Sequence, residues 1–245
     1  MPLFSRKGAD IAHWEGAAED WIAWARRPGH DAYWAYEPVL RAFIGAGAGA
    51  AIDIGCGEGR VSALLVALGY HVTAIDPVER MVAAAREKGS ADAYAIAPAA
   101  QIPFASESFD LALMYNILTV LENIPKALAE TRRLLRPDGR LVISVTHPFS
   151  ERAEKEGEDG ATILRLEEGY FGRERYSMRA ERAGLRMDFA GWTQPLSLYT
   201  EALARAGFAI TRMIEPQPSP RSPWRGRERW TKFPLFLWIE ARPLG

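Results

Sequence analysis

The chain has 245 residues, enough for one large domain or for a core domain with an added cap. Its 30 Lys and Arg residues nearly balance its 31 Asp and Glu residues, so the overall charge indicates no nucleic-acid or acidic-membrane surface. Its single cysteine excludes an internal disulfide and a multi-thiolate zinc site, and its four histidines are too scattered to predict a metal.

The first segment, residues 1–46, is predicted to form an N-terminal helical cap. Its aromatic residues recur largely at intervals of three, four or seven, which is typical of amphipathic helices. We expect two helices broken at Pro28-Gly29, with Asp31 as the N-cap of the second. The beginning of the chain lacks the apolar stretch of a signal peptide, and no run approaches the ~18 apolar residues of a membrane span. We therefore expect a cytoplasmic protein.

Strand and helix signals alternate through the predicted core, residues 47–146. Short apolar runs bounded by turn residues indicate strands, and periodic runs closed by glycine indicate helices. Such alternation implies crossover connections and a parallel sheet with helices on both faces. We expect strands over 50–54, 70–75, 93–97, 109–115 and 140–146, and helices over 60–68, 78–88 and 124–135.

The pattern breaks at residues 147–192, which carry a charged stretch followed by aromatic residues. We interpret this segment as an insertion after the fifth strand. Residues 193–245 return to the core, with a helix over 196–206, a strand over 208–215, a proline-rich loop and a last strand over 235–241.

The run AIDIGCGEGR at 51–60 predicts a nucleotide-type site at the end of the first strand. Its glycines let the backbone turn sharply and approach a ligand closely. The dinucleotide fingerprint needs a glycine where Arg60 stands, and Asp53 would place a carboxylate near a pyrophosphate, so both argue against NAD. Asp76 ends the next strand, where a carboxylate can accept both ribose hydroxyls of NAD or of S-adenosylmethionine (SAM).

The same residues resemble the motifs of class I SAM-dependent methyltransferases, of the small-molecule, methyltransferase type 11-like kind. AIDIGCGEGR resembles their motif I, and Asp76-Pro77 resembles the acidic motif that ends their second strand. SFDLALMYNIL at 108–118 resembles their fourth motif. ALAETRRLLRPDGRLVISVTHP at 127–148 resembles the helix, turn and fifth strand that follow. The similarity covers about residues 50–148, in a specific order and spacing.

The resemblance implies an α/β fold with a Rossmann-like, doubly wound, seven-stranded and mostly parallel sheet. From the residues outside the resemblance we expect an N-terminal helical cap over 1–46 and an insertion over 147–192 that forms a lid over the acceptor site. It implies an enzyme that transfers a methyl group from SAM to a small-molecule acceptor by in-line displacement, with S-adenosylhomocysteine as product. The implied cofactor-binding residues are Asp53, Gly55, Cys56, Gly57, Arg60, Asp76, Pro77, Met81, Ala99, Ala100, Tyr115, Asn116 and Ile117.

One departure from the family concerns adenine recognition. The family commonly has an Asp-Ala pair after the third strand, whereas residues 97–101 read Ala-Pro-Ala-Ala-Gln. The backbone amides of Ala99 and Ala100 are therefore expected to contact the adenine edge, with Gln101 as a substitute partner.

The acceptor side is predicted from position alone. The transfer needs a nucleophile held in line with the S–CH₃ bond, and a general base only if the acceptor must lose a proton. His147 directly follows the fifth strand and is the candidate base, with an inert turn histidine as the alternative. The candidate acceptor contacts are Tyr33, Trp34, His147, Tyr170 and Tyr176, although aromatic residues at helical spacing more often serve packing.

Three other functions stay open. A SAM- or nucleoside-binding protein without catalysis would show the same motifs, because the transfer step leaves little signature. An RNA methyltransferase is suggested by basic residues at 221–232 interleaved with Trp224 and Trp230, but Tyr115-Asn116-Ile117-Leu118 lacks the double-proline pattern of enzymes that methylate exocyclic base nitrogens. An NAD-dependent oxidoreductase is the least favoured. Nucleic-acid and membrane partners are not expected.

Overall fold

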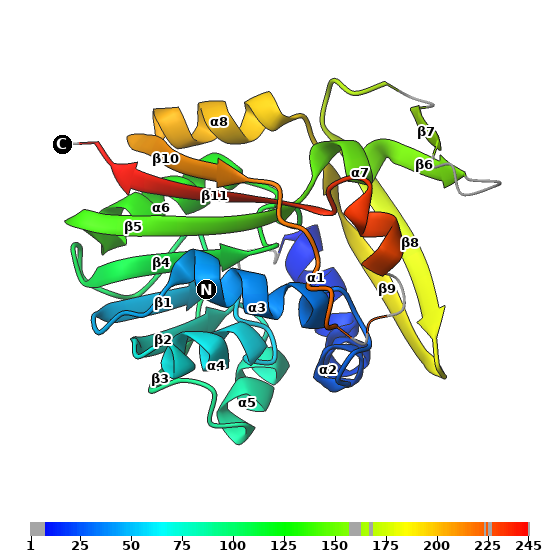
Figure 1. The fold of residues 1–245 in the computed structure, drawn as a ribbon. Coiled ribbons are helices and arrows are strands. Elements are labelled where there is room, and N and C mark those ends of the chain that lie inside the picture. The colour runs from blue at the N-terminus through cyan, green and yellow to red at the C-terminus, as the bar shows by residue number, and fades with distance from the viewer. Residues whose placement is uncertain (1–7, 157–162, 167–168, 223, 225–226, 245) are drawn as a thin grey trace, which may run out of the picture.

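The computed structural model describes residues 8–156, 163–166, 169–222, 224 and 227–244, and its centre is a seven-stranded sheet. The strands lie in the order β10-β11-β5-β4-β1-β2-β3 (Figure 1). Strands β1 to β5 are mutually parallel, and β11 and β10 add two antiparallel strands at one edge. The strands are β1 (Ala50–Ile54), β2 (His71–Asp76), β3 (Ala93–Ile96), β4 (Phe109–Tyr115), β5 (Leu135–Thr146), β10 (Phe208–Ile214) and β11 (Phe236–Pro243).

The predicted fold class is confirmed, and the strand order shows where a ligand belongs. The chain runs outward from β1 to β2 and β3, then returns to β4 on the other side of β1. In open α/β sheets, ligands bind outside the carboxyl ends of the strands at such a reversal. Strand β5 differs most from its expected bounds: it begins at Leu135 rather than at residue 140, because Leu135 pairs with Phe109 before a shift in register.

Helices cover both faces of the sheet. Successive residues of β4 point to opposite faces, and each face buries its own cluster. Leu111 and Leu113 pack with α3 and α4, whereas Ala112 and Met114 pack with α6 and α8. Helix α5 packs beside β2 and β3. These helices are α3 (Tyr33–Ile44), α4 (Arg60–Ala67), α5 (Glu79–Glu87), α6 (Ile124–Leu134) and α8 (Leu196–Arg205).

The described part of the N-terminal segment, residues 8–46, forms three helices rather than the two expected. Helices α1 (Ala9–Gly16) and α2 (Ala18–Arg26) meet at the buried Ala17, and the expected break at Pro28-Gly29 separates α2 from α3. Asp31 accepts a hydrogen bond from the backbone N–H of Tyr33 at 3.1 Å, so its side chain serves the first turn of α3, although Ala32 directly precedes the helix. Because α3 packs on the sheet, only α1 and α2 lie beyond it.

The expected insertion contains strands that its sequence did not predict. It begins with α7 (Pro148–Arg152), which leads to a hairpin of β6 (Ala153–Glu156) and β7 (Ile163–Leu166). A longer hairpin of β8 (Glu174–Arg182) and β9 (Leu185–Thr193) follows and lies against α1 and α2 (Figure 1, yellow).

Two hydrogen bonds tie this long hairpin and the residue that follows it to the loop after β4. The N–H of Trp192 donates to the carbonyl oxygen of Thr119 at 2.7 Å. The side-chain amide of Gln194 donates to the carbonyl oxygen of Leu118 at 3.3 Å. The hairpin is therefore fixed both to the N-terminal helices and to the end of a central strand.

The tryptophans that suggested a nucleic-acid surface are buried. Trp224 is 6% exposed and Trp230 is 9% exposed, and both belong to the cluster under α3 that includes Trp238. Trp230 lies in a short 3-10 helix, η1 (Arg227–Thr231), and Arg225 lies outside the described residues. Rings enclosed in this way offer no face for base stacking, so the aromatic half of that pattern serves packing.

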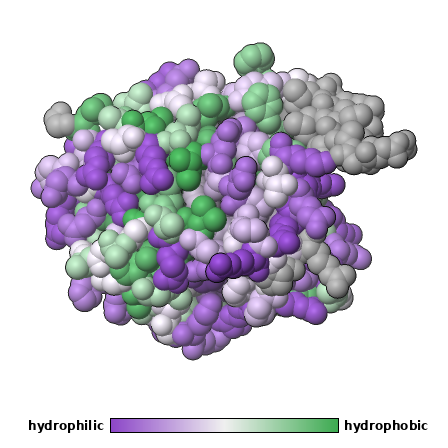
Figure 2. Space-filling model, viewed as in Figure 1, coloured by the Kyte–Doolittle hydropathy of each residue, from purple (hydrophilic) through white to green (hydrophobic). Residues whose placement is uncertain are grey.

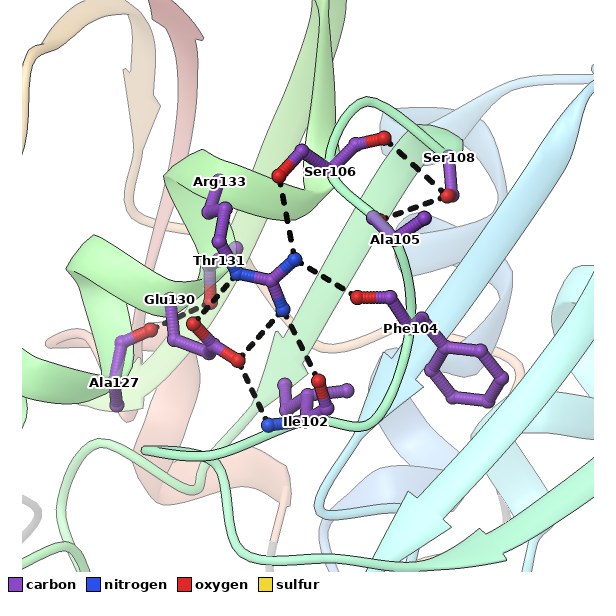
Figure 3. Close-up of polar contacts among 9 residues, drawn as sticks. All are labelled: Ile102, Phe104, Ala105, Ser106, Ser108, Ala127, Glu130, Thr131 and Arg133. Carbon is purple, nitrogen blue, oxygen red and sulfur yellow. Dashed lines mark hydrogen bonds and ion pairs between the residues drawn. The ribbon is translucent and has the colours of Figure 1, made fainter.

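An ion pair on α6 pins the segment between β3 and β4 (Figure 3). Arg133 contacts Glu130 at 2.8 Å and donates hydrogen bonds to the carbonyl oxygens of Ile102 at 3.0 Å and Phe104 at 2.8 Å. Glu130 in turn accepts a hydrogen bond from the N–H of Ile102 at 2.8 Å. The Arg133 guanidinium holds the pKa of the Glu130 carboxyl below its usual range. The chain that leaves β3 is thereby held at a fixed distance from α6.

The surface mixes polar and apolar side chains (Figure 2). No helix within the described ranges is long and apolar enough to cross a membrane. The described residues also contain no group of three or more His, Cys, Asp or Glu side chains placed to hold a metal ion.

Candidate cofactor and acceptor site

A cavity of about 290 Å³ opens at the carboxyl ends of β1, β2 and β4. The glycine loop after β1, the ends of β2 and β4, and the segment after β3 line one part of it. Helices α1 and α2 and the β8–β9 hairpin line the other part. The first part contains Asp53, Gly55, Cys56, Gly57, Glu58, Arg60, Val61, Asp76, Pro77, Val78, Met81, Pro98, Ala99, Tyr115, Asn116 and Ile117.

The glycine loop is shaped so that its backbone faces the cavity. Gly55 and Gly57 have φ angles of +76° and +54°, which L side chains rarely adopt. A Cβ at Gly55 would lie 2.3 Å from Cγ2 of Ile117, so a larger residue could not fit there. The N–H groups of Gly55 and Cys56 donate to the carbonyl oxygen of Ile75 at 2.8 and 2.9 Å, which ties the loop to β2.

Asp76 connects this loop to the second strand. Its carboxylate accepts hydrogen bonds from the N–H of Gly57 at 3.0 Å and from the N–H of Val78 at 2.9 Å. Burial raises the pKa of Asp76 to about 6, and these two hydrogen bonds oppose the rise. Each carboxylate oxygen keeps further acceptor capacity, so the group can also receive hydroxyl donors from a ligand.

Asp53 is a second buried carboxyl group, 1% exposed, at the end of β1. It accepts a hydrogen bond from the hydroxyl of Ser62 at 2.6 Å. Burial raises the pKa of Asp53 to about 7, although the Ser62 hydrogen bond lowers it. Strongly perturbed carboxyl groups in a cavity are typical of a functional site, and a cationic ligand group would stabilise their ionised form.

Arg60 fastens the N-terminal helices to the glycine loop. Its guanidinium forms a salt bridge with Asp31 at 2.7 Å and lies over the rings of Trp21 and Tyr33, 5.0 and 4.5 Å from their centroids. The two charged side chains are 9% and 13% exposed. Glu58, which was not among the predicted site residues, is 1% exposed, and its Oε1 has no hydrogen-bond partner among the described residues.

The turn after β4 closes this part of the cavity. Asn116 has a φ of +59°, a conformation that asparagine tolerates better than most residues. Its N–H donates to the carbonyl oxygen of Ser144 at 2.7 Å, and its side-chain oxygen accepts from the Ser144 hydroxyl at 2.7 Å. The next residue, Ile117, packs against Gly55, so the loops after β1 and β4 support each other.

The structure brings the sequence-predicted cofactor residues together around one cavity, with the exception of Ala100. Pro98 and Ala99 line the cavity after β3, whereas Ala100 and the proposed substitute partner Gln101 do not. Gln101 is exposed. Any adenine contact from this segment would therefore come from Pro98 and Ala99.

Most of the sequence-predicted acceptor residues lie elsewhere. Tyr176 lines the cavity. Tyr33 is buried under Arg60, and Trp34 packs with the α3 cluster. Tyr170 stacks on Phe149, with ring centroids 4.8 Å apart, and its hydroxyl accepts a hydrogen bond from a backbone N–H. The aromatic spacing in the first helices thus served packing at these positions.

His147 does not line the cavity either. Its Nε2 contacts a carboxylate oxygen of Glu215 at 2.9 Å, and its Nδ1 accepts the N–H of Phe149 at 3.3 Å. Burial lowers the pKa of His147, and the Glu215 carboxylate opposes this shift. Both ring nitrogens are engaged at the end of the sheet, which matches the alternative of an inert turn histidine.

The other part of the cavity comes from residues that the sequence did not single out. They are contributed by α1 and α2, by the loop after β4, by the end of β5 and by the β8–β9 hairpin. The spacing of positions 10 and 14 on one helix face was the available signal, but nothing local indicates which segment such a face meets. These residues are Asp10, Ile11, Trp14, Trp21, Thr119, Val120, Leu121, Thr146, Phe189 and Ala190.

Comparison with known proteins identifies the core. Residues 52–143 match the family model of the methyltransferase domain. Over 93 residues the chain is 38% identical to the malonyl-[acyl-carrier protein] O-methyltransferase of Erwinia pyrifoliae. That match covers 38% of this chain and 36% of the relative, so the chain spans about a third of the relative's length.

Solved structures extend the likeness beyond the core. A S-adenosylmethionine dependent methyltransferase from Mesorhizobium loti is 25% identical, with a TM-score of 0.68 over 86% of this chain and 98% of that one. The 1,6-didemethyltoxoflavin-N1-methyltransferase of Burkholderia thailandensis is 20% identical and shares the fold, with a TM-score of 0.59 over 100% of this chain and 94% of that one. Residues 52–143 therefore form a methyltransferase domain, and most of the chain has the fold of SAM-dependent methyltransferases.

Proposed function

We propose that the protein transfers a methyl group from SAM to a small-molecule acceptor. The observation that carries this proposal is the cavity at the sheet reversal, where two buried carboxyl groups and an open glycine loop meet in a methyltransferase domain. Apolar and aromatic side chains line most of the acceptor part of this cavity, which is typical of small-molecule sites.

The residues of the cavity fit SAM. Asp76 would accept the ribose hydroxyls, and Asp53 would receive the amino group of the methionine part, directly or through water. Gly55 and Gly57 line the cavity without side chains of their own, so the methionine chain can approach the backbone of the loop. Pro77, Met81 and Ala99 would flank the adenine. When bound, SAM supplies an electrophilic methyl carbon on a sulfonium.

The protein's contribution to the reaction is alignment and exclusion of water. Holding the nucleophile in line with the S–CH₃ bond can lower the barrier by about 7–11 kcal/mol. No step is assigned to His147, because its nitrogens are bonded to Glu215 and Phe149 and it does not line the cavity. The walls made by α1, α2 and the β8–β9 hairpin would keep water from the methyl group.

Isothermal titration calorimetry tests the cofactor assignment. The purified protein should bind SAM and S-adenosylhomocysteine and should not bind NADH, because one cavity supplies both the loop and the ribose carboxylate. Binding of NADH without binding of either SAM form would overturn the proposal and favour an oxidoreductase. Binding of SAM without transfer to any acceptor would leave the non-catalytic alternative.

A further inference from the structure

One carboxylate in the acceptor part of the cavity has an unused oxygen. Asp10, in the first turn of α1, lines the cavity, and its side chain is 13% exposed. Its Oδ2 is buried and has no hydrogen-bond partner within the described chain. Its Oδ1 lies 3.4 Å from a guanidinium nitrogen of Arg175, a residue that is itself 46% exposed and does not line the cavity. An unpaired buried carboxylate oxygen is costly, so a donor from a ligand would be strongly favoured.

Aromatic rings line the same cavity as this carboxylate. Trp14 and Trp21 meet edge to face with centroids 5.8 Å apart, and Trp21 meets Phe189 in the same way at 6.2 Å. All three rings line the cavity beside Ile11. Such rings bury an apolar body and can attract a cation through their faces.

The charges of the cavity favour the same kind of ligand. Its lining holds four carboxyl groups, those of Asp10, Asp53, Glu58 and Asp76. Its guanidinium, on Arg60, already forms a salt bridge with Asp31 at 2.7 Å. Asp53 and Asp76 are assigned to the cofactor, so Asp10 and Glu58 are the carboxyl groups left to face an acceptor. The guanidinium of Arg173 lies close enough to Asp10 for the two charges to interact, but neither Arg173 nor Arg175 lines the cavity. The described lining therefore favours a basic acceptor over an anionic one.

We propose, on the basis of the methyltransferase function proposed above, that the acceptor is an amine on an aromatic or similarly apolar body and that Asp10 binds its nitrogen. The amine arrives as its ammonium ion, pairs with the Asp10 carboxylate and loses one proton to water. The neutral nitrogen then donates an N–H hydrogen bond to that carboxylate, with its lone pair directed toward the methyl group. The nitrogen lone pair forms the new N–CH₃ bond while the S–CH₃ bond breaks and its electron pair stays on sulfur. The nitrogen then carries the positive charge and releases one proton to the Asp10 carboxylate or to water. The chain therefore needs no histidine base.

Matched probes that differ only in their polar group test this assignment. We would titrate 2-phenylethylamine, 2-phenylethanol and 3-phenylpropionate into the protein saturated with S-adenosylhomocysteine, and follow binding by calorimetry. The amine should bind most tightly and the carboxylate least. Incubation of the amine with SAM should give its N-methyl product in a mass spectrum.

Two isosteric variants isolate the role of Asp10. Asp10→Asn should weaken amine binding by about tenfold to a hundredfold, the effect of losing one charge-assisted hydrogen bond, and leave the affinity for S-adenosylhomocysteine unchanged. Asp20→Asn, which alters an exposed carboxylate on α2, should change neither affinity. Arg175→Gln removes the guanidinium that contacts Oδ1 of Asp10. This variant should still bind the amine more tightly than the carboxylate probe.

The outcomes separate the two proposals. If S-adenosylhomocysteine binds but the acid binds as tightly as the amine, or no amine binding is seen, or Asp10→Asn leaves amine binding intact, the amine assignment is overturned and the methyltransferase proposal stands. Amine binding without an N-methyl product overturns the transfer step. If S-adenosylhomocysteine itself does not bind, the proposed function fails and the amine assignment fails with it.

Discussion

Replacing Asp76 with alanine should damage cofactor binding far more than it damages the fold. The carboxylate is placed to receive both ribose hydroxyls of SAM, and each charge-assisted hydrogen bond contributes about 1.5–3 kcal/mol. Losing two of them removes about 3–6 kcal/mol, which corresponds to a dissociation constant raised roughly a hundredfold to ten-thousandfold.

The structure also predicts how Asp76→Ala changes the stability of the protein without cofactor. Asp76→Ala leaves the N–H groups of Gly57 and Val78 without their acceptor. Burial nevertheless raises the pKa of Asp76 to about 6, which means that the fold holds this ionised carboxylate at a cost that alanine removes. These two effects on the free energy of unfolding oppose each other. We therefore expect the melting temperature of the variant to stay close to that of the wild type.

Cys56→Ala is the matched control. Cys56 lines the same loop, but its side chain packs with Ala74 and Ala85 and contributes no charge-assisted bond. Calorimetry with S-adenosylhomocysteine should therefore give a nearly unchanged dissociation constant for this variant. Comparable dissociation constants for the two variants, with both proteins folded by circular dichroism, would refute the ribose role of Asp76.

Three further predictions concern charge. The affinity for SAM should fall by about tenfold from about pH 8 to about pH 6, because the pKa of Asp53 is about 7 and the amino group of SAM pairs with the ionised form; a flat calorimetric pH profile would contradict this pairing. Arg60→Leu should lower the free energy of unfolding in urea by about 3–5 kcal/mol, because it leaves Asp31 buried and unpaired; an unchanged midpoint would mean that the pair contributes nothing net. His147→Ala should lower the melting temperature by breaking the contact with Glu215 and leave kcat within about threefold of the wild type once an acceptor is known; a larger loss would return His147 to the reaction.

The bounds of several core strands and the position of the glycine loop could be predicted from the sequence, because they depend on neighbouring residues. The bounds of β1 and β4 agree with expectation because each is a short apolar run that ends in a glycine or asparagine turn. The glycine loop and Asp76 meet because parallel strands align their carboxyl ends, which the alternation of strands and helices already implied.

The parts decided by distant contacts could not be predicted. Strands β8 and β9 have a mixed, charged sequence, and they are held by packing against α1 and α2, far away in the chain. His147 stands where expected, at the end of β5, but it contacts Glu215, 68 residues away, and not the cavity. Asp10 has its proposed role in acceptor binding only because the hairpin folds back beside α1. Local patterns place backbone segments, whereas side-chain partners depend on the tertiary arrangement.

The attachment of the β8–β9 hairpin to the first helices affects the order in which parts of the chain fold. The contact between the His13 ring and the carbonyl oxygen of Asp188 joins residues 175 positions apart, and the pair of Arg175 and Asp10 spans 165 positions. Contacts of such long sequence separation form slowly, because closing a long loop costs conformational entropy before the contact can stabilise the fold. The pairings of β1, β2 and β4 span much shorter stretches. We therefore expect refolding to restore the cofactor half of the cavity first, so that the freshly made chain can bind SAM before its acceptor wall has closed.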